Sequence, residues 1–247
     1  ASILSKKLAA SPEALVLDVK IGSGAFMKTV EEARALETSL VETANAAGCP
    51  TQALITDMNQ PLVASLGNAL EVAEVMRALT GQRQGPILDI TVALGGVVLQ
   101  QAGLGAAVEQ LRVEGNGRAA VRFARMVAAQ GGPLGFDEKW ERFLPEAPVI
   151  LEVTAEEAGY VAAINGEALG LTVVRLGGGR MVESDRIDPS VGISDLLPLG
   201  AKVAKGDVLA RIHAARADAA QEAKAALRAA VSVAPVAPAL PPLVPER

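Results

Sequence analysis

Apolar and polar residues near the start of the chain follow one another in an order that predicts a strand–helix–strand unit. Residues 14–19 (ALVLDV) form a nearly continuous apolar run, which is typical of a strand buried on both faces. Apolar residues then recur at helical spacing over residues 30–47, and residues 52–57 (QALITD) form a second apolar run. Two strands joined through a helix pair in parallel, so we expect a right-handed βαβ unit, the building block of a parallel sheet.

Helical periodicity predicts further elements on either side of this unit. Residues 2–10 predict a short helix, which ends at Ser11-Pro12 because the residue before a proline is disfavoured in the α conformation. Further helices are predicted at residues 66–80 and 87–103, with two more within residues 105–130. The sequence Gly115-Asn116-Gly117 predicts a turn in that last stretch rather than a domain boundary.

The hydrophobic pattern changes near residue 146. Short strands are predicted at residues 148–155, 159–164 and 206–213, and prolines and glycines now recur at short intervals. Residues 165–176 leave two alternatives open, because Asn165-Gly166 is a hairpin signal while the apolar residues after it suit one face of a helix. Residues 214–230 are rich in alanine and predict a helix.

These patterns together predict an α/β fold followed by a smaller α+β domain. We expect the α/β domain at residues 14–146 and the C-terminal α+β domain at residues 147–234. Residues 235–247 are rich in proline, so we expect an extended or disordered tail. Half of all residues are apolar but only 2% are aromatic, so the cores must be built from Ala, Val, Leu and Ile.

Composition excludes several classes of partner. The formal net charge is −5, lysines and arginines are dispersed, and aromatic residues able to stack on bases are scarce, so we expect no nucleic-acid binding. No apolar stretch reaches the roughly 20 residues of a membrane-spanning helix, and no secretory signal pattern opens the chain. The single cysteine, Cys49, excludes an internal disulfide and suits a reducing compartment. We therefore expect a soluble, cytoplasmic protein without a membrane partner.

Local patterns offer candidate sites, each with a plainer alternative. The glycine-rich loop Gly22–Lys28 follows a predicted strand, where ligands bind in parallel sheets, yet it matches neither a dinucleotide fingerprint nor a P-loop. On pattern alone, a tight turn into a helix is the favoured explanation. Ser2 and Lys6 stand four residues apart on one helix face and together suit the polar edge of a ligand, although a solvated helix end has the same spacing.

The remaining polar segments and residues give weaker indications of a functional site. The segment Asp57–Leu62 follows a predicted strand and has the composition of a turn. Glu71 and Glu74 lie one turn apart on a predicted helix, as surface carboxylates often do. A single cysteine and a single histidine, His213, provide no nucleophile–base pair, and we expect His213 to be a packed residue at a strand end. No cluster has the spacing of zinc ligands.

Several segments in fixed order resemble the signature blocks of the pyrimidine-nucleoside phosphorylase family, which includes the thymidine phosphorylases. The first blocks are SILSKKLA, LDVKIGSGAFMKT, LITDMNQPL and GNALEV. The blocks GYV, RLGGGR, DPSVGI and GDVLARIHA resemble that family's C-terminal domain. The similarity runs from Ser2 to about residue 230, and its early blocks are highly specific in combination.

The resemblance implies an incomplete nucleoside phosphorylase core, with residues 1–13 as the remnant of a helical domain that binds the base and forms the dimer. The implied reaction is phosphorolysis of a pyrimidine nucleoside, with phosphate as co-substrate and no organic cofactor. Ser2 and Lys6 would bind the polar edge of the base, and Ile3 and Phe26 would form its apolar walls. The Lys6 ammonium would stabilise the negative charge that develops on the departing base.

The resemblance also implies a structural cation site, best assigned to potassium. Its ligands in this chain would be the backbone carbonyls of Leu62 and Ser65 and the carboxylate of Glu74. Oxygen ligands of this kind suit a hard cation. Relatives often have alanine at the position of Ser65, a change that a carbonyl ligand tolerates. The remaining ligands would come from a part of the family's sequence upstream of Ala1.

One large departure from the family pattern concerns phosphate. The family's phosphate site is a KxSTGG-type segment that belongs upstream of Ala1, and the 247 residues contain no equivalent. The family's base-binding arginine would lie upstream as well. We expect residues 1–247 alone to turn over very slowly or not at all, and we expect the full-length protein to be a homodimer. A related phosphorylase, such as an AMP phosphorylase, and a non-catalytic module that needs a partner chain remain alternatives. The choice between thymidine and uridine also stays open.

Overall fold

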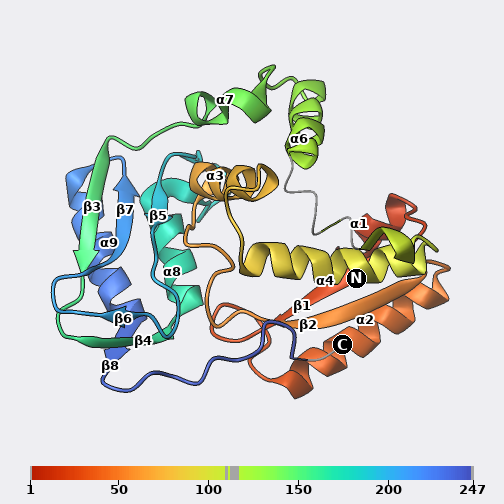
Figure 1. Ribbon diagram of the computed structural model, residues 1–247, viewed down its shortest axis with the longest axis horizontal. Coiled ribbons are helices and arrows are strands. Elements are labelled where there is room, and N and C mark those ends of the chain that lie inside the picture. Colours follow the sequence, from red (N-terminus) through yellow and green to blue (C-terminus); the bar gives the residue numbers. More distant parts are fainter. Residues whose placement is uncertain (1, 109–110, 112–116, 246–247) are drawn as a thin grey trace. The chain divides into compact units, whose positions relative to one another are not determined.

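The computed structural model describes residues 2–108, 111 and 117–245 (Figure 1). The chain divides into two compact units, and neither is continuous in sequence. The first unit contains Ala1–Met58, Gln84–Glu114 and Pro241–Arg247, and the second contains Asn59–Arg83 and Gly115–Leu240. The fold is mixed α/β and includes a parallel sheet, as the sequence predicts.

The first unit is built on a parallel pair of strands. Among the described residues, β1 (Leu15–Ile21) pairs with β2 (Thr51–Asp57), with Leu15 opposite Thr51 and Ile21 opposite Asp57. Helix α2 (Val30–Ala46) connects them, which confirms the predicted order. Its core contains buried residues from these three elements and from α1: Leu4, Leu17, Val19, Ile21, Ala33, Ala44, Ala53 and Ile55.

The two strands differ in how their second faces are covered. β2 is buried on both faces, apart from Gln52. The expectation of two buried faces is wrong for β1, where Asp18 is exposed and Lys20 is only partly buried. The charged side chains on this face pair with each other, and the Lys20 ammonium lies 2.6 Å from an Asp18 carboxylate oxygen.

Helices complete the first unit. Helix α1 (Ser2–Ala9) contacts α2 and sends Leu4 into the core. Helix α4 (Pro86–Gln101) contacts both strands, and the 3-10 turn η1 (Gly105–Ala107) follows it. Helix α2 begins with a capping box, in which the Thr29 hydroxyl accepts from the Glu32 N–H and the Glu32 carboxylate accepts from the Thr29 N–H.

The second unit contains two antiparallel sheets within its described residues. In one sheet β7 (Val208–Ala214) lies between β3 (Val149–Thr154) and β5 (Gly192–Ser194). In the other, β4 (Gly159–Ile164) lies between β6 (Lys202–Val203) and β8 (Val231–Ala234). Helices α8 (Gly166–Val173) and α9 (Ala217–Ala230) pack on each other, so residues 165–176 adopt the helical alternative. The Asn165 side chain caps α8 by accepting from the Ala168 N–H.

Helix α3 (Asn68–Leu79) also belongs to the second unit, together with α6 (Arg118–Ala129), α7 (Phe136–Phe143) and the short π-helix η2 (Val174–Gly178). The buried residues Ala73, Met76, Ala120, Ala124, Phe136 and Trp140 form the core shared by α3, α6 and α7. Gly117 precedes α6 in a left-handed conformation, whereas Gly115 and Asn116 of the predicted turn lie outside the described residues.

Hydrogen bonds join the segment before α3 to the C-terminal sheets. Leu66 and Ile193 exchange two backbone hydrogen bonds of 2.9 and 2.8 Å, which place the start of α3 beside β5. The Leu196 N–H donates to the Ala64 carbonyl, and the Leu199 N–H donates to the Gln60 side chain. Residues far apart in sequence therefore form one packed unit.

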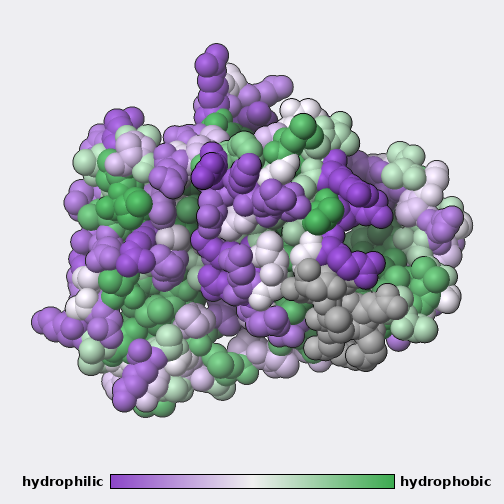
Figure 2. Space-filling view, turned by 45° about the horizontal axis from the view of Figure 1, so that its top comes forward, coloured by the Kyte–Doolittle hydropathy of each residue, from purple (hydrophilic) through white to green (hydrophobic). Residues whose placement is uncertain are grey.

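The proline-rich end of the chain has no helix or strand over residues 235–245. From Pro241 on it belongs to the first unit, in which the Asp57 N–H donates to the Leu243 carbonyl over 3.0 Å. On the face shown in Figure 2, hydrophilic residues are interspersed with hydrophobic ones. Among the described residues, no helix combines the length and the apolar character that crossing a membrane requires.

Candidate functional site

Helix α1 presents two of the predicted base-binding residues to solvent. Ile3 is 53% exposed and Lys6 is exposed, while Leu4 between them is buried and anchors the helix. Lys6 makes no hydrogen bond or ion pair with any residue that the structure describes. Ser2 begins the helix, but its side chain lies outside the described part of the chain. The spacing of Ser2 and Lys6 places both positions on one helix face.

The glycine-rich loop after β1 is fixed by backbone hydrogen bonds. The Gly22 N–H donates to the Met27 carbonyl over 3.2 Å, and the Ala25 N–H donates to the Gly22 carbonyl over 3.1 Å. The Gly24 N–H donates to the carbonyl of Met58, the residue after β2, over 3.0 Å. A Cβ at Gly24 would lie 3.1 Å from that carbonyl oxygen, so the close approach favours glycine.

Phe26 stands at the tip of this fixed loop. Its neighbour Ala25 is buried, whereas Phe26 itself is 97% exposed. A phenylalanine side chain normally gains stability from burial, so a held loop that leaves it in water is suited to covering an apolar ligand. Ile3, Lys6 and Phe26 thus belong to the same compact unit, and all three are accessible.

A polar cluster ties the two parallel strands together near their carboxyl ends. Lys20 donates to the Thr56 hydroxyl over 2.9 Å and pairs with the Asp18 carboxylate, which also accepts from Thr56. Lys20 and Thr56 are register partners in the sheet. Local sequence patterns predict no role for these residues, although the charged pair at alternate positions in LDVK is a signal for one.

The three predicted cation ligands lie in the segment before and within α3. Ser65 is 4% exposed, Glu74 is 3% exposed, and Leu62 is partly buried. The local spacing of Glu74 suggested a surface carboxylate, but the side chain is buried. One of its oxygens accepts from Arg77 over 2.8 Å and from Arg83 over 3.2 Å. The other oxygen, Oε2, lies 3.1 Å from Arg83 Nε but has no hydrogen bond of good geometry.

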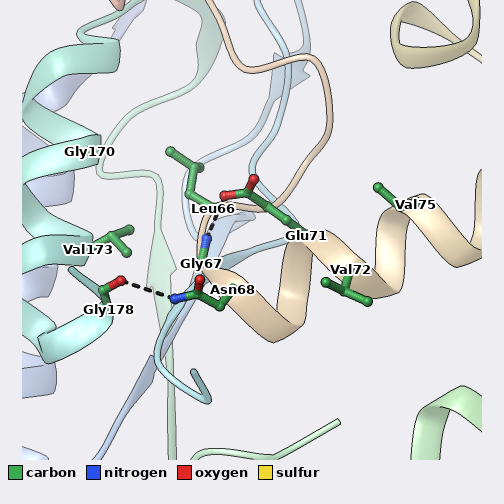
Figure 3. A pocket seen from close by; sticks show the side chains of 9 residues that line it. All are labelled: Leu66, Gly67, Asn68, Glu71, Val72, Val75, Gly170, Val173 and Gly178. Atoms are coloured by element: carbon green, nitrogen blue, oxygen red, sulfur yellow. Dashed lines mark hydrogen bonds between the residues drawn. The ribbon is translucent and has the colours of Figure 1, made fainter. Parts of the chain in front are cut away.

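An open cavity of about 450 Å³ lies beside α3 in the second unit (Figure 3). Its wall is formed by residues of α3, of α8 and of the turns next to them: Leu66, Gly67, Asn68, Glu71, Val72, Val75, Gly170, Val173 and Gly178. Glu71 accepts from the Gly67 N–H, and the Asn68 amide donates to the Gly178 carbonyl. None of the predicted site residues lines this cavity.

His213 lies on β7 and is half-buried. Its Nε2 is 2.9 Å from the Ser194 hydroxyl, and Ser194 also donates to the Asp195 carboxylate over 3.1 Å. Burial lowers the pKa of His213, an effect that the nearby Asp195 carboxylate partly opposes. Burial alone would raise the pKa of Asp195, but hydrogen bonds from Arg211 and Ser194 hold it below its usual value. The cluster lacks a carboxylate bonded to the imidazole, so it does not form a nucleophile–base–acid relay.

Metal-ligand side chains do not gather elsewhere in the described residues, which contain no group of three or more His, Cys, Asp or Glu side chains able to hold an ion. The ligands expected at Leu62 and Ser65 are backbone carbonyls, which do not belong to this class of side chains.

Comparison with known proteins matches two parts of the chain to two family models. Residues 1–116 match the glycosyl transferase family a/b domain, and residues 160–234 match the pyrimidine nucleoside phosphorylase C-terminal domain.

Two curated relatives match across the junction between these domains. Thymidine phosphorylase from Agrobacterium fabrum is 48% identical over 229 residues, which cover 90% of this chain and 52% of the relative. Thymidine phosphorylase from Mesorhizobium japonicum is 51% identical over 235 residues, which cover 92% of this chain and 53% of the relative. The chain spans about half the length of these relatives. The signature blocks, the parallel α/β core and these matches agree, and the chain is similar to about half the length of the pyrimidine-nucleoside phosphorylases it matches.

Proposed function

We propose that the protein, as its gene encodes it, phosphorolyses pyrimidine nucleosides. Phosphate attacks C1′ of the sugar, the glycosidic bond breaks, and the products are a free base and a pentose 1-phosphate. The observation that carries the proposal is the exposed Lys6 ammonium, which has no partner among the described residues, in a chain about half identical to two thymidine phosphorylases. Thymidine, deoxyuridine and uridine are the proposed substrates, phosphate is the co-substrate, and no organic cofactor takes part.

In this proposal Lys6 and Ser2 contact the polar edge of the pyrimidine. The leaving base gains negative charge as the glycosidic bond breaks, and a fixed ammonium stabilises that charge where it develops. Ile3 and Phe26 supply apolar walls for the ring, a role that their exposure of 53% and 97% permits. Burial of these side chains against the base would add apolar contact to the polar recognition.

The proposal assigns the attacking phosphate to a KxSTGG-type segment, which the 247 residues do not contain. We therefore propose that residues 1–247 by themselves turn over very slowly or not at all. We further propose that the protein works in the cytoplasm, which suits its single cysteine, and that it is a homodimer, as the family resemblance implies.

We also propose that Leu62, Ser65 and Glu74 contribute to a structural potassium site. Support comes from the donor type, because two backbone carbonyls and one carboxylate suit a hard cation, and from Glu74 Oε2, which is buried without a hydrogen bond. Arg83 competes with an ion at that oxygen, since its Nε lies 3.1 Å away. Ion binding therefore requires the partly exposed Arg83 side chain to leave Oε2.

Potassium dependence of stability tests this site. We expect the melting temperature of the protein to rise when choline chloride is replaced by potassium chloride at constant ionic strength, because an ion that binds only the folded state stabilises it. Glu74→Gln should abolish that difference, while Glu71→Gln serves as a matched control on the same helix. Equal melting temperatures for the wild-type protein in the two salts would contradict the proposal.

Kinetics of the gene-encoded protein test the reaction itself. Thymidine, uridine, deoxyuridine and AMP are incubated separately with phosphate, and the free base is quantified by chromatography. Pyrimidine release supports the proposal, and we expect Lys6→Met to lower kcat/KM by about 10²–10³-fold, the usual loss for one group that stabilises developing charge. Lys7→Met, an equal charge change next to it, should have less than a tenfold effect. Turnover of AMP alone would indicate the related phosphorylase class, and no turnover of any substrate would indicate a non-catalytic module.

A further inference from the structure

We infer that Lys28 is a positioning residue for nucleoside binding, because its ammonium fixes the loop that presents Phe26. This inference rests on the proposed function, in which Phe26 forms an apolar wall of the base site. The family blocks do not distinguish Lys28 from the other residues of GSGAFMKT, and its role comes from the contacts of its side chain.

The Lys28 side chain turns back onto the loop that precedes it. Its ammonium donates to the Ala25 carbonyl over 2.7 Å and to the Ser23 carbonyl over 3.3 Å. The Ala25 carbonyl belongs to the planar peptide group that ends at the Phe26 nitrogen. Holding this oxygen fixes the orientation of the peptide plane, and thereby the direction in which Phe26 leaves the loop.

The backbone of Lys28 is anchored on its other side by helix α2. The Lys28 N–H donates to a Glu32 carboxylate oxygen over 2.9 Å, and the same oxygen belongs to the capping box with Thr29. Lys28 thus connects the rigid first turn of a 17-residue helix to the loop tip. Among the described residues, the backbone hydrogen bonds of the loop involve Gly22, Gly24, Ala25 and Met27, and none of them uses the Phe26 N–H or carbonyl.

The helix itself does not favour a cation at this position. Lys28 directly precedes the N-cap Thr29, where the partial positive charge of the helix terminus repels an ammonium. Acidic residues at Glu31 and Glu32 suit the same terminus. The two carbonyl contacts therefore give the Lys28 ammonium a role in the loop that the helix dipole does not provide.

Loss of the ammonium should affect binding more than folding. The Ser23 carbonyl contact is exposed and the Ala25 carbonyl contact is part-buried, and neither carbonyl belongs to a side chain of the apolar core, so we expect the unit to keep its fold. Phe26 is 97% exposed and has few contacts of its own, so its direction depends on the backbone. Without Lys28 a smaller fraction of molecules would present Phe26 correctly, and the apparent affinity for the nucleoside falls in proportion.

Steady-state kinetics of four variants of the gene-encoded protein test the inference. We expect Lys28→Met to raise the nucleoside KM about three- to tenfold, with kcat and the phosphate KM within about twofold of wild type. Lys28→Arg should keep the nucleoside KM closer to the wild-type value, because a guanidinium also donates to carbonyls. Lys205→Met, at an exposed turn of the second unit, controls for the charge change. In a Phe26→Ala background Lys28→Met should raise the KM no further.

Several results would overturn the inference. An unchanged nucleoside KM, or a rise that persists in the Phe26→Ala background, would show that Lys28 does not act through Phe26. Insoluble Lys28→Met protein, or a lowered melting temperature with all kinetic constants changed together, would assign Lys28 to the stability of α2. Absence of pyrimidine phosphorolysis by the wild-type protein would overturn the proposed function as well, whereas wild-type turnover with an unaffected Lys28→Met KM would overturn only this inference.

Discussion

The candidate functional side chains of this protein differ in burial, and the contacts that position them differ accordingly. Lys6 and Phe26 face solvent and depend on an anchored backbone, through Leu4 in α1 and through the hydrogen-bonded loop after β1. Glu74 and His213 lie in the second unit, where burial must be offset by partners. Two arginines donate hydrogen bonds to Glu74, whereas the hydrogen-bond partner of His213 is a serine hydroxyl. Burial therefore favours the neutral form of the His213 imidazole.

The lowered pKa of His213 predicts a pH-dependent stability. The ordinary pKa of histidine is 6.5, so in the unfolded chain His213 binds a proton below that pH. In the folded protein His213 binds the proton only at a lower pH. The unfolded state therefore binds more protons in that window, and stability falls as pH falls from about 6.5 towards the folded-state pKa. We expect the melting temperature of wild type to fall more than that of His213→Gln between pH 7.5 and pH 5.5.

Comparison of the two proteins isolates this residue from other groups. Asp195, Arg211 and Glu146 are the charged groups that act on His213, and all three remain in the variant. Asp195 has a lowered pKa and stays ionised throughout the range. Parallel melting curves for wild type and His213→Gln across the range would refute the prediction.

Two N-cap glycines provide a test of packing at the scale of helices. Gly67 precedes α3 with φ of 130°, and Gly85 precedes α4 with φ of 120°. A Cβ at Gly67 would lie 2.5 Å from the Val191 carbonyl oxygen, whereas a Cβ at Gly85 would meet nothing within 4 Å. Backbone strain is similar at the two sites, so only the clash differs.

We expect Gly67→Ala to destabilise the protein by about 2 kcal/mol more than Gly85→Ala, the usual cost of forcing extra volume into a packed site. The clash involves backbone on both sides and cannot be relieved by a side-chain rotation. Urea unfolding followed by circular dichroism measures both variants. Equal losses would mean that the segment before α3 does not pack closely against Val191.

Most long elements of this fold follow from hydrophobic spacing, and the short ones do not. The strands β1, β2, β3, β4 and β7 and the helices α2, α3, α4 and α9 lie close to their predicted positions. β5 has three residues and β6 has two, too few for any periodicity to appear. β8 has four residues next to the proline-rich tail, and its pairing with β4 depends on long-range contact.

The candidate site divides along the same line. The sequence singles out Lys6 and Phe26 because they lie in segments that resemble the signature blocks of the family. It does not single out Lys28 as a loop anchor or Thr56 as a partner of Asp18 and Lys20, since those roles depend on how a side chain folds back or on which strands pair. The burial of Glu74 depends likewise on arginines that local spacing does not connect to it.

For the whole molecule, the order of residues along the chain does not match the division into units. The segment Asn59–Arg83 leaves the first unit directly after β2 and joins the C-terminal sheets through the Leu66 and Ile193 hydrogen bonds. The tail makes the opposite passage, because residues up to Leu240 belong to the second unit and Pro241–Arg247 belong to the first. The second unit therefore includes Asn59–Arg83, and the first includes Pro241–Arg247, although neither segment adjoins the rest of its unit in sequence.

Truncation tests the contribution of the tail. Ending the chain at Leu240 removes the Leu243 carbonyl, which accepts from the Asp57 N–H at the end of β2, and Asp57 is only 6% exposed. A buried donor without its acceptor costs about 1–3 kcal/mol, so we expect a melting temperature lower by several degrees. Ending the chain at Val244 keeps the Leu243 peptide and should leave the melting temperature near that of wild type.

Hydrogen exchange at the Asp57 amide locates the effect. This amide lies at the carboxyl end of a parallel strand, next to Met58, whose carbonyl accepts from Gly24 in the loop that presents Phe26. Faster exchange at Asp57 in the Leu240 truncation, and wild-type exchange in the Val244 truncation, would show that the tail stabilises the strand end that supports the base-site loop. Identical exchange in both truncations would mean that the tail lies on the first unit without stabilising it.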